Sequence, residues 1–187
     1  MSETLKAILE RRSVRTFKPE QLKEDELQKI LEAGRFAPSA RNEQLWHFSV
    51  VQNQALLGKI NQILQQIFLN SGDPALAARA KAENFSPFHH APTLIIVSAD
   101  EKNAIAPEPD ASLALGNIFL AAHALGIGSV WIHSLRNLFQ SDAGRALQKE
   151  LGIPDGYRIY GSAALGYNAG PAPATPPRKE GTVTFIR

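Results

Sequence analysis

Residues 111–135, ASLALGNIFLAAHALGIGSVWIHSL, contain no Asp, Glu, Lys or Arg. A charge-free run of this length is long enough to cross a bilayer. However, Asn117 and His123 lie inside it, and Gly126 and Gly128 interrupt it before a short apolar stretch. This order favours a helix followed by a strand over one continuous membrane span. Because the helix lacks a charged face, we expect it to be buried on all sides, in the core or against a second subunit.

The segments on either side alternate between helical and strand-like patterns. Apolar residues repeat at helical spacing in several segments, and shorter apolar runs are typical of buried strands. No internal repeat is visible, so we expect layers in which helices cover one central sheet, of the α/β or the α+β class. The predicted strands are 47–51, 93–97, 130–132 and 157–165, and the predicted helices begin after Ser2, at Glu24, near Leu56, at Pro74, at Asp110 and after Ser141.

Length and composition limit the class of protein. A chain of 187 residues is the size of one domain, so residues 1–187 are expected to form a single unit. Lys and Arg number 20 against 18 Asp and Glu, and the resulting charge of +2 is too small for a nucleic-acid binder. The absence of Cys excludes disulfides and thiolate catalysis. The histidines show no recognised ligand spacing, so no metal site is expected. Residues 1–15 lack the apolar core of a signal peptide, which predicts a soluble, cytoplasmic protein.

The C-terminal segment differs from the rest of the chain. Residues 171–187 begin with a proline-rich arm, which favours an extended polyproline II conformation. Beyond the arm, Thr182-Val183-Thr184-Phe185-Ile186 alternates polar and apolar residues, as a half-buried strand does. Two placements remain open. The strand adds to the sheet of a partner subunit, or the arm folds back on its own sheet.

Residues 11–15, Arg-Arg-Ser-Val-Arg, bring three cations and a hydroxyl to the junction between the first helix and an extended segment, 14–17. Guanidinium groups form bidentate hydrogen bonds with phosphate, so this cluster is a candidate site for a phosphomonoester. The alternative is that the cations only complement the negative end of the helix dipole. Arg178-Lys179, at the end of the arm, is a candidate second clamp.

Other sequence motifs lack the flanking elements or residues that their usual functions require. Gly126-Ile127-Gly128 follows a helix and precedes a strand, the reverse of a Rossmann glycine turn. Ser39 and Ser134 lack a Gly-x-Ser-x-Gly elbow, and no ordered Ser–His–Asp set can be argued. If the chain is an enzyme, we expect a cofactor to supply the difficult chemistry.

Five segments, in order along nearly the whole chain, resemble the nitroreductase family of FMN-dependent oxidoreductases. The longest, Pro38 to Phe48, is similar to the family's Pro-Ser-x-x-Asn-x-Gln-Pro-Trp, with Leu45 in place of the usual proline. Each segment is a weak signal alone, but the ordered set is fairly specific. The other four are 11–15, 125–132, 151–157 and 177–179, with the sequences RRSVR, LGIGSVWI, LGIPDGY and PRK.

The resemblance implies an α+β fold in which helices surround a central, mostly antiparallel sheet, with the C-terminal strand exchanged between the subunits of a homodimer. It also implies two FMN molecules at the subunit interface. A cation near the flavin pyrimidine edge, matched by Arg15, would make the flavin easier to reduce. The other matched residues are Arg11, Arg12, Ser13, Arg178 and Lys179 at the phosphate and ribityl chain, Pro38, Ser39, Ala40 and Asn42 reaching the flavin from the other subunit, and Trp131, Ile132, His133 and Ser134 with their backbone along it.

The function that the resemblance implies is an NAD(P)H-dependent flavin oxidoreductase. NADH or NADPH and a nitroaromatic, quinone or related small acceptor would use one pocket in turn, which gives ping-pong kinetics. The alternatives are reduction of an enal or activated alkene, an FMN-binding sensor or carrier without turnover, and a non-flavin phosphate- or nucleic-acid-binding module. The His133 amide is a candidate donor to flavin N5, and its ring is a substrate group or a bystander. Residues 70–90 are either a lid over the flavin or ordinary packing.

Overall fold

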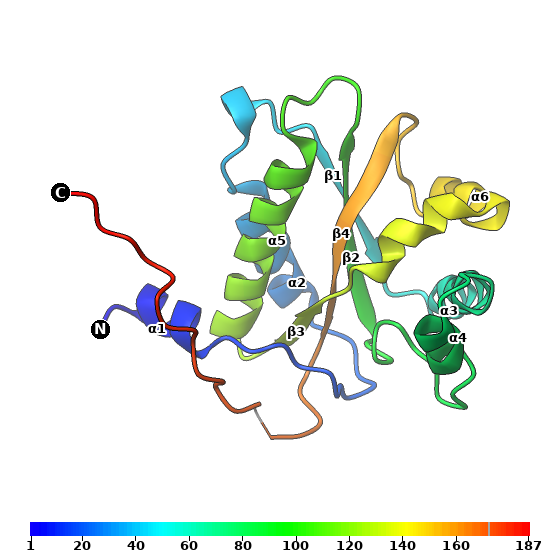
Figure 1. Ribbon diagram of the computed structural model, residues 1–187, viewed down its shortest axis with the longest axis horizontal. Coiled ribbons are helices and arrows are strands. Elements are labelled where there is room, and N and C mark those ends of the chain that lie inside the picture. Colours follow the sequence, from blue (N-terminus) through cyan, green and yellow to red (C-terminus); the bar gives the residue numbers. More distant parts are fainter. Residues whose placement is uncertain (172) are drawn as a thin grey trace.

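The computed structural model describes residues 1–171 and 173–187. Its centre is a four-stranded antiparallel sheet in the order β1-β2-β4-β3, with helices on both faces (Figure 1). This confirms the predicted α+β fold. Among the described residues, none of the helices combines the length and apolar character needed to cross a membrane. The strands are β1 (Trp46–Val51), β2 (Thr93–Asp100), β3 (Gly128–Trp131) and β4 (Tyr157–Gly166), and the helices are α1 (Glu3–Glu10), α2 (Glu24–Arg35), η1 (Ala40–Asn42), α3 (Gln54–Leu69), α4 (Pro74–Ala80), α5 (Pro107–Ala124), η2 (Ser134–Gln140) and α6 (Asp142–Glu150).

The central strand β2 divides the core into two apolar layers. Leu94 and Ile96 pack in the layer that contains α3, whereas Ile95 and Val97 pack in the layer that contains α5. Successive side chains of a strand point to opposite faces, so a continuous run of β-branched and aliphatic residues is what a strand buried on both sides requires. Figure 1 shows the same division, with α2 and α5 on one face and α3, α4 and α6 on the other.

The helix α5 differs from its prediction in two ways. It begins at Pro107 rather than at Asp110, because a proline in the first turn loses no helical hydrogen bond. Asp110 is buried, and its carboxylate accepts the backbone N–H of Ala40 at 3.1 and 3.3 Å. Within the single chain the helix is not buried on all sides, since Leu113 is 48% exposed. One side of this charge-poor helix is therefore available to another subunit.

The segment between α3 and β2 packs as core. Phe68, Phe85 and Phe88 are all buried, and the rings of Phe68 and Phe85 meet edge to face at 5.7 Å. Buried aromatic pairs of this kind stabilise the contact between elements. Of the two interpretations of residues 70–90, the structure therefore supports packing for these aromatic side chains.

The C-terminal tail does not return to the sheet of its own chain. Residues 182–186 form no strand, and Val183, Phe185 and Ile186 are 69%, 75% and 95% exposed. In Figure 1 the tail passes α1 and ends away from the sheet. Of the two open placements, the one in which the arm folds back on its own sheet is therefore wrong. Pairing of this segment with a partner's sheet stays a prediction.

Two helical glycines should respond in opposite ways to alanine. An added Cβ at Gly144 would lie 1.8 Å from the Leu138 carbonyl oxygen, whereas none of the neighbouring atoms lies within 4 Å of a Cβ at Gly58. Gly144→Ala should destabilise the fold by about 3 kcal/mol or more, because backbone must move. Gly58→Ala should stabilise it by about 0.5–1 kcal/mol, because alanine loses less entropy in a helix. Urea unfolding measures both, and equal effects of the two substitutions would contradict this packing.

Candidate functional site

The first part of the candidate site is the segment that follows α1. Here the chain runs extended beside β3, because the N–H of Val14 donates to the Ser129 carbonyl at 3.0 Å and Ser13 pairs with Ser129 in a parallel bridge. The extended segment predicted for 14–17 is confirmed. These contacts fix Arg11 and Arg12 between the end of α1 and the start of β3.

Three guanidinium groups from opposite ends of the chain gather at this junction. The pKa of Arg11 is lowered, first by burial and then by the positive charges of Arg12 and Arg178. Arg12 donates to the Arg11 carbonyl at 2.6 Å and to the Thr175 hydroxyl, but its Nε is buried without a partner among the described residues. Like charges held together beside an unpaired buried donor form a site that an anion would stabilise.

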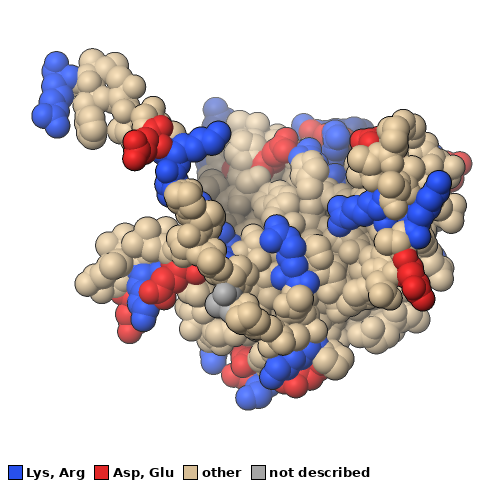
Figure 2. Space-filling view, turned by 60° about the horizontal axis from the view of Figure 1, so that its bottom comes forward, with Lys and Arg blue, Asp and Glu red and all other residues tan. Residues whose placement is uncertain are grey.

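Figure 2 shows the face of the molecule from which the C-terminal tail projects. The tail extends away from the body, and basic side chains lie on the tail and on the neighbouring surface. Lys179 is exposed on the tail, next to Arg178. Arg178 is exposed like Lys179, whereas Arg11 and Arg12 are partly buried.

Arg15 follows Ser13 and Val14 in the same extended segment. Burial lowers the pKa of His89, and the positive charges of Arg15, Arg79 and His90 lower it further. His89 and His90 both have left-handed backbone, with φ of 57° and 54°, which is uncommon outside glycine. Arg15 and His89 therefore face a common region. The sequence analysis missed His89, since its spacing from Arg15 carries no signal.

The turn at residues 38–42 lies at the opposite end of α5. Ser39 accepts the N–H of Gln44 at 3.1 Å, and Ala40 is tied to Asp110 in the first turn of α5, while Pro38 and Asn42 are exposed. An 18-residue helix is about 27 Å long. Figure 1 shows η1 near one end of α5 and α1 near the other. Within one chain, this turn and the arginine cluster do not reach the same small ligand.

The arginine cluster lies near the start of β3, whereas the stretch from Trp131 to Ser134 begins at the last residue of that strand. The N–H of Ile132 donates to the Ser162 carbonyl, and the Ser162 hydroxyl donates back to the Ile132 carbonyl, both at 2.8 Å. Trp131 packs against Phe119, with ring centroids 6.2 Å apart. The backbone here is therefore rigid. His133 is exposed and lines a pocket beyond the end of the strand.

The arginine cluster suits the phosphate end of a mononucleotide. It offers several guanidinium donors, and one of them, the buried Nε of Arg12, has no protein partner among the described residues. Guanidinium groups recognise phosphate through paired N–H donors. The residues present therefore fit the phosphate of FMN, and β3 provides a rigid edge leading away from it.

Comparison with known proteins identifies the family. The family model described as "Nitroreductase family" matches residues 8–167. A nitroreductase with bound FMN from Bacteroides fragilis has a TM-score of 0.94 and 38% identity, covering 100% of both chains. A second, with bound FMN from Desulfitobacterium hafniense, has a TM-score of 0.91 and 30% identity, again over 100% of both chains. An Archaeoglobus fulgidus protein named "Putative NADH dehydrogenase/NAD(P)H nitroreductase" is 36% identical over 171 residues, 89% of this chain and 86% of that one. With these matches spanning most of its length, the chain belongs to the nitroreductase family.

Proposed function

We propose that the protein is a homodimeric, FMN-dependent NAD(P)H oxidoreductase, built from one domain over residues 1–187, that reduces small acceptors such as nitroaromatics and quinones. The observation that carries the proposal is the convergence of Arg11, Arg12 and Arg178, with the Arg12 Nε buried and without a partner among the described residues. Solved relatives over the whole chain contain FMN, and the name of the Archaeoglobus relative supplies NADH or NADPH as the reductant.

The residues of this chain have distinct roles toward the cofactor. The three arginines, with Ser13 and Lys179, bind the phosphate and ribityl chain. Arg15 would face the pyrimidine edge, where its positive charge would stabilise negative charge on a reduced ring. The backbone from Trp131 to Ser134 would line the flavin, and the His133 amide would be available as a hydrogen-bond donor to it. When bound, FMN relays a hydride between reduced nicotinamide and the acceptor.

The distance along α5 supports a site shared by two subunits. Residues 38–42 lie about one helix length, roughly 27 Å, from the arginine cluster of their own chain. They contribute to a flavin site only if a second copy brings them there. Apolar residues are exposed where such a copy would pack: Leu5, Ile8 and Leu9 on α1 are 49–57% exposed, and Leu113 on α5 is 48% exposed.

The edge strand β1 is the docking place we propose for the partner's residues 182–186. At the other edge of the sheet, β3 is already flanked by Ser13 and Val14. Within the described part of the chain, β1 pairs only with β2, and a groove of about 880 Å³ beside it is lined by Leu31, Trp46, Phe48 and Val50, among others. A strand with alternating apolar residues suits such an edge, because its main chain completes the ladder and its side chains enter the groove.

The overall reaction balances without a protein-borne nucleophile. A nitroaromatic, NAD(P)H and one proton give the nitroso compound, NAD(P)⁺ and water. Reductant and acceptor use one pocket in turn, so the kinetics should be ping-pong. The protein positions both, excludes water and supplies the fixed charges.

The test is the colour of the purified protein and its response to reductant. The protein should be yellow, release FMN on denaturation, bleach anaerobically with NADPH or NADH, and regain its colour with a nitroaromatic. Bleaching without reoxidation by any nitroaromatic, quinone or activated alkene would favour a sensor or carrier. Colourless protein that takes up no added FMN would contradict the proposal.

A further inference from the structure

A pocket of about 580 Å³ lies beyond the end of β3, next to the stretch assigned to the flavin. It is lined by residues that follow β2, residues in and before η2, and residues at the start of β4, among them Lys102, His133, Arg136, Tyr157 and Arg158. The volume is within the usual range for small-molecule sites. His133 links this pocket to the proposed flavin edge, since it lines the pocket and belongs to the stretch that we propose lies along the flavin.

Arg136 is held in place inside this pocket. Its Nη1 forms an ion pair with Glu108 of α5 at 2.7 Å, and its guanidinium carbon lies 5.9 Å from the centre of the Tyr160 ring. Its backbone N–H donates to the His133 carbonyl at 3.1 Å, so it lies one short turn from that residue. The side chain is only 21% exposed. A guanidinium fixed on two sides is pre-organised, and the Glu108 bond uses one of its five N–H donors.

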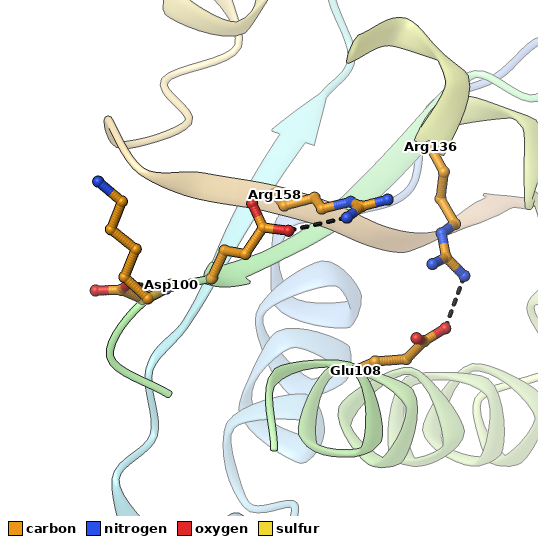
Figure 3. Close-up of polar contacts among 6 residues, drawn as sticks. Asp100, Glu108, Arg136 and Arg158 are labelled. Atoms are coloured by element: carbon orange, nitrogen blue, oxygen red, sulfur yellow. Dashed lines mark hydrogen bonds and ion pairs between the residues drawn. The ribbon is translucent and has the colours of Figure 1, made fainter. Parts of the chain in front are cut away.

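The other charges around the pocket are balanced, so the unused donors of Arg136 are its distinguishing feature. Arg158 pairs with Glu101 at 2.9 Å, with both side chains about half exposed. Figure 3 shows Arg158 on β4 and Arg136 on η2, each directed at a carboxylate, with Arg136 reaching down to Glu108 on α5. With Lys102, whose positive charge acts on the Asp100 carboxylate, three cationic side chains stand against three carboxylates. Aromatic side chains, Phe139 and Tyr157, complete its wall.

We propose that this pocket is the acceptor subsite and that Arg136 binds an anionic substituent, a carboxylate, on an aromatic acceptor. The inference rests on the proposed function and names its substrate class. An aromatic ring fits against the wall formed by Phe139 and Tyr157, and the carboxylate meets the fixed guanidinium. Charge-assisted, paired hydrogen bonds of this kind give selectivity as well as affinity.

The two partners of the ion pair give an experiment that separates binding from structure. Benzoate is the probe, and its affinity for the FMN-loaded enzyme is measured by calorimetry. Arg136→Gln should weaken benzoate binding about tenfold or more, the effect of losing a hydrogen bond to a charged group. Glu108→Gln should strengthen it, because it removes a competing carboxylate. Lys59→Gln, which breaks the ion pair with Glu150 elsewhere, is the control and should change nothing. Loss of affinity in both Arg136→Gln and Glu108→Gln, or no change in either, would overturn the inference.

Turnover provides the second readout. The ratio of kcat/KM for 4-nitrobenzoate to that for neutral 4-nitrotoluene should fall about tenfold or more in Arg136→Gln. If instead only the KM for NADPH rises, with NADH unaffected, the pocket binds the phosphate of the reductant and the inference is wrong. Failure of the unaltered enzyme to reduce 4-nitrotoluene and every other neutral acceptor would count against the proposed function, whereas an unchanged ratio counts against this inference alone.

Discussion

Replacing Arg11 with alanine should weaken FMN binding by about 1.5–3 kcal/mol, the scale of a hydrogen bond to a charged group. Arg11 is the member of the cluster whose pKa is lowered by burial and by Arg12 and Arg178. A phosphate placed between these cations relieves their mutual repulsion, so the affinity depends on each of them. Fluorescence titration of the apoprotein with FMN measures the change.

The matched control for Arg11→Ala is Lys59→Ala. Lys59 is also basic, but it pairs with Glu150 and lies outside the cluster. It should leave the FMN affinity unchanged, which shows that net charge alone is not responsible. If Arg11→Ala and Lys59→Ala bind FMN equally well, Arg11 does not belong to the site.

Removing residues 182–187 should dissociate the dimer and, with it, the flavin. Val183, Phe185 and Ile186 are largely exposed in the single chain, so they have apolar surface to bury on a partner. Burying two such side chains stabilises each arm by about 3 kcal/mol or more. Because the turn at 38–42 reaches the flavin only from a second subunit, FMN should be lost together with the partner. Light scattering after size-exclusion chromatography, with absorbance of bound flavin, measures both.

Deletion of Arg187 alone is the control for this truncation. It shortens the chain without removing the alternating apolar residues, and it should leave the dimer and its FMN intact. A truncated protein that remains dimeric and keeps its flavin would show that the tail does not join the subunits.

Local sequence patterns predicted helices and strands well where a single physical cause determines the local structure. The continuous apolar run of β2 requires a strand buried on both faces, and the pattern of acids at its start placed α2. The start of α5 was misplaced because Pro107 and Pro109 suggest a loop, although proline fits the first helical turn. Its burial was also overestimated, since a chain alone does not show what a second copy covers.

Contacts between residues far apart in the sequence could be predicted only in part. The proximity of Arg11 to Arg178 followed from the resemblance, and no spacing rule relates residues at opposite ends of a chain. Arg136 and Glu108 are 28 positions apart on two elements, and the charge of Arg15 acts on His89 from a distant part of the sequence, so neither interaction has a local signal. Such pairs are determined by how the layers pack, which periodicity does not specify.

The central claim is that cations from both ends of one chain bind the phosphate of FMN. Riboflavin is FMN without that phosphate, so the ratio of their dissociation constants isolates the contribution of the clamp. With two or more charge-assisted hydrogen bonds, FMN should bind at least about 100-fold more tightly than riboflavin. Equal affinities would show that these guanidinium groups do not hold the phosphate, and the site would have to be sought elsewhere on the protein.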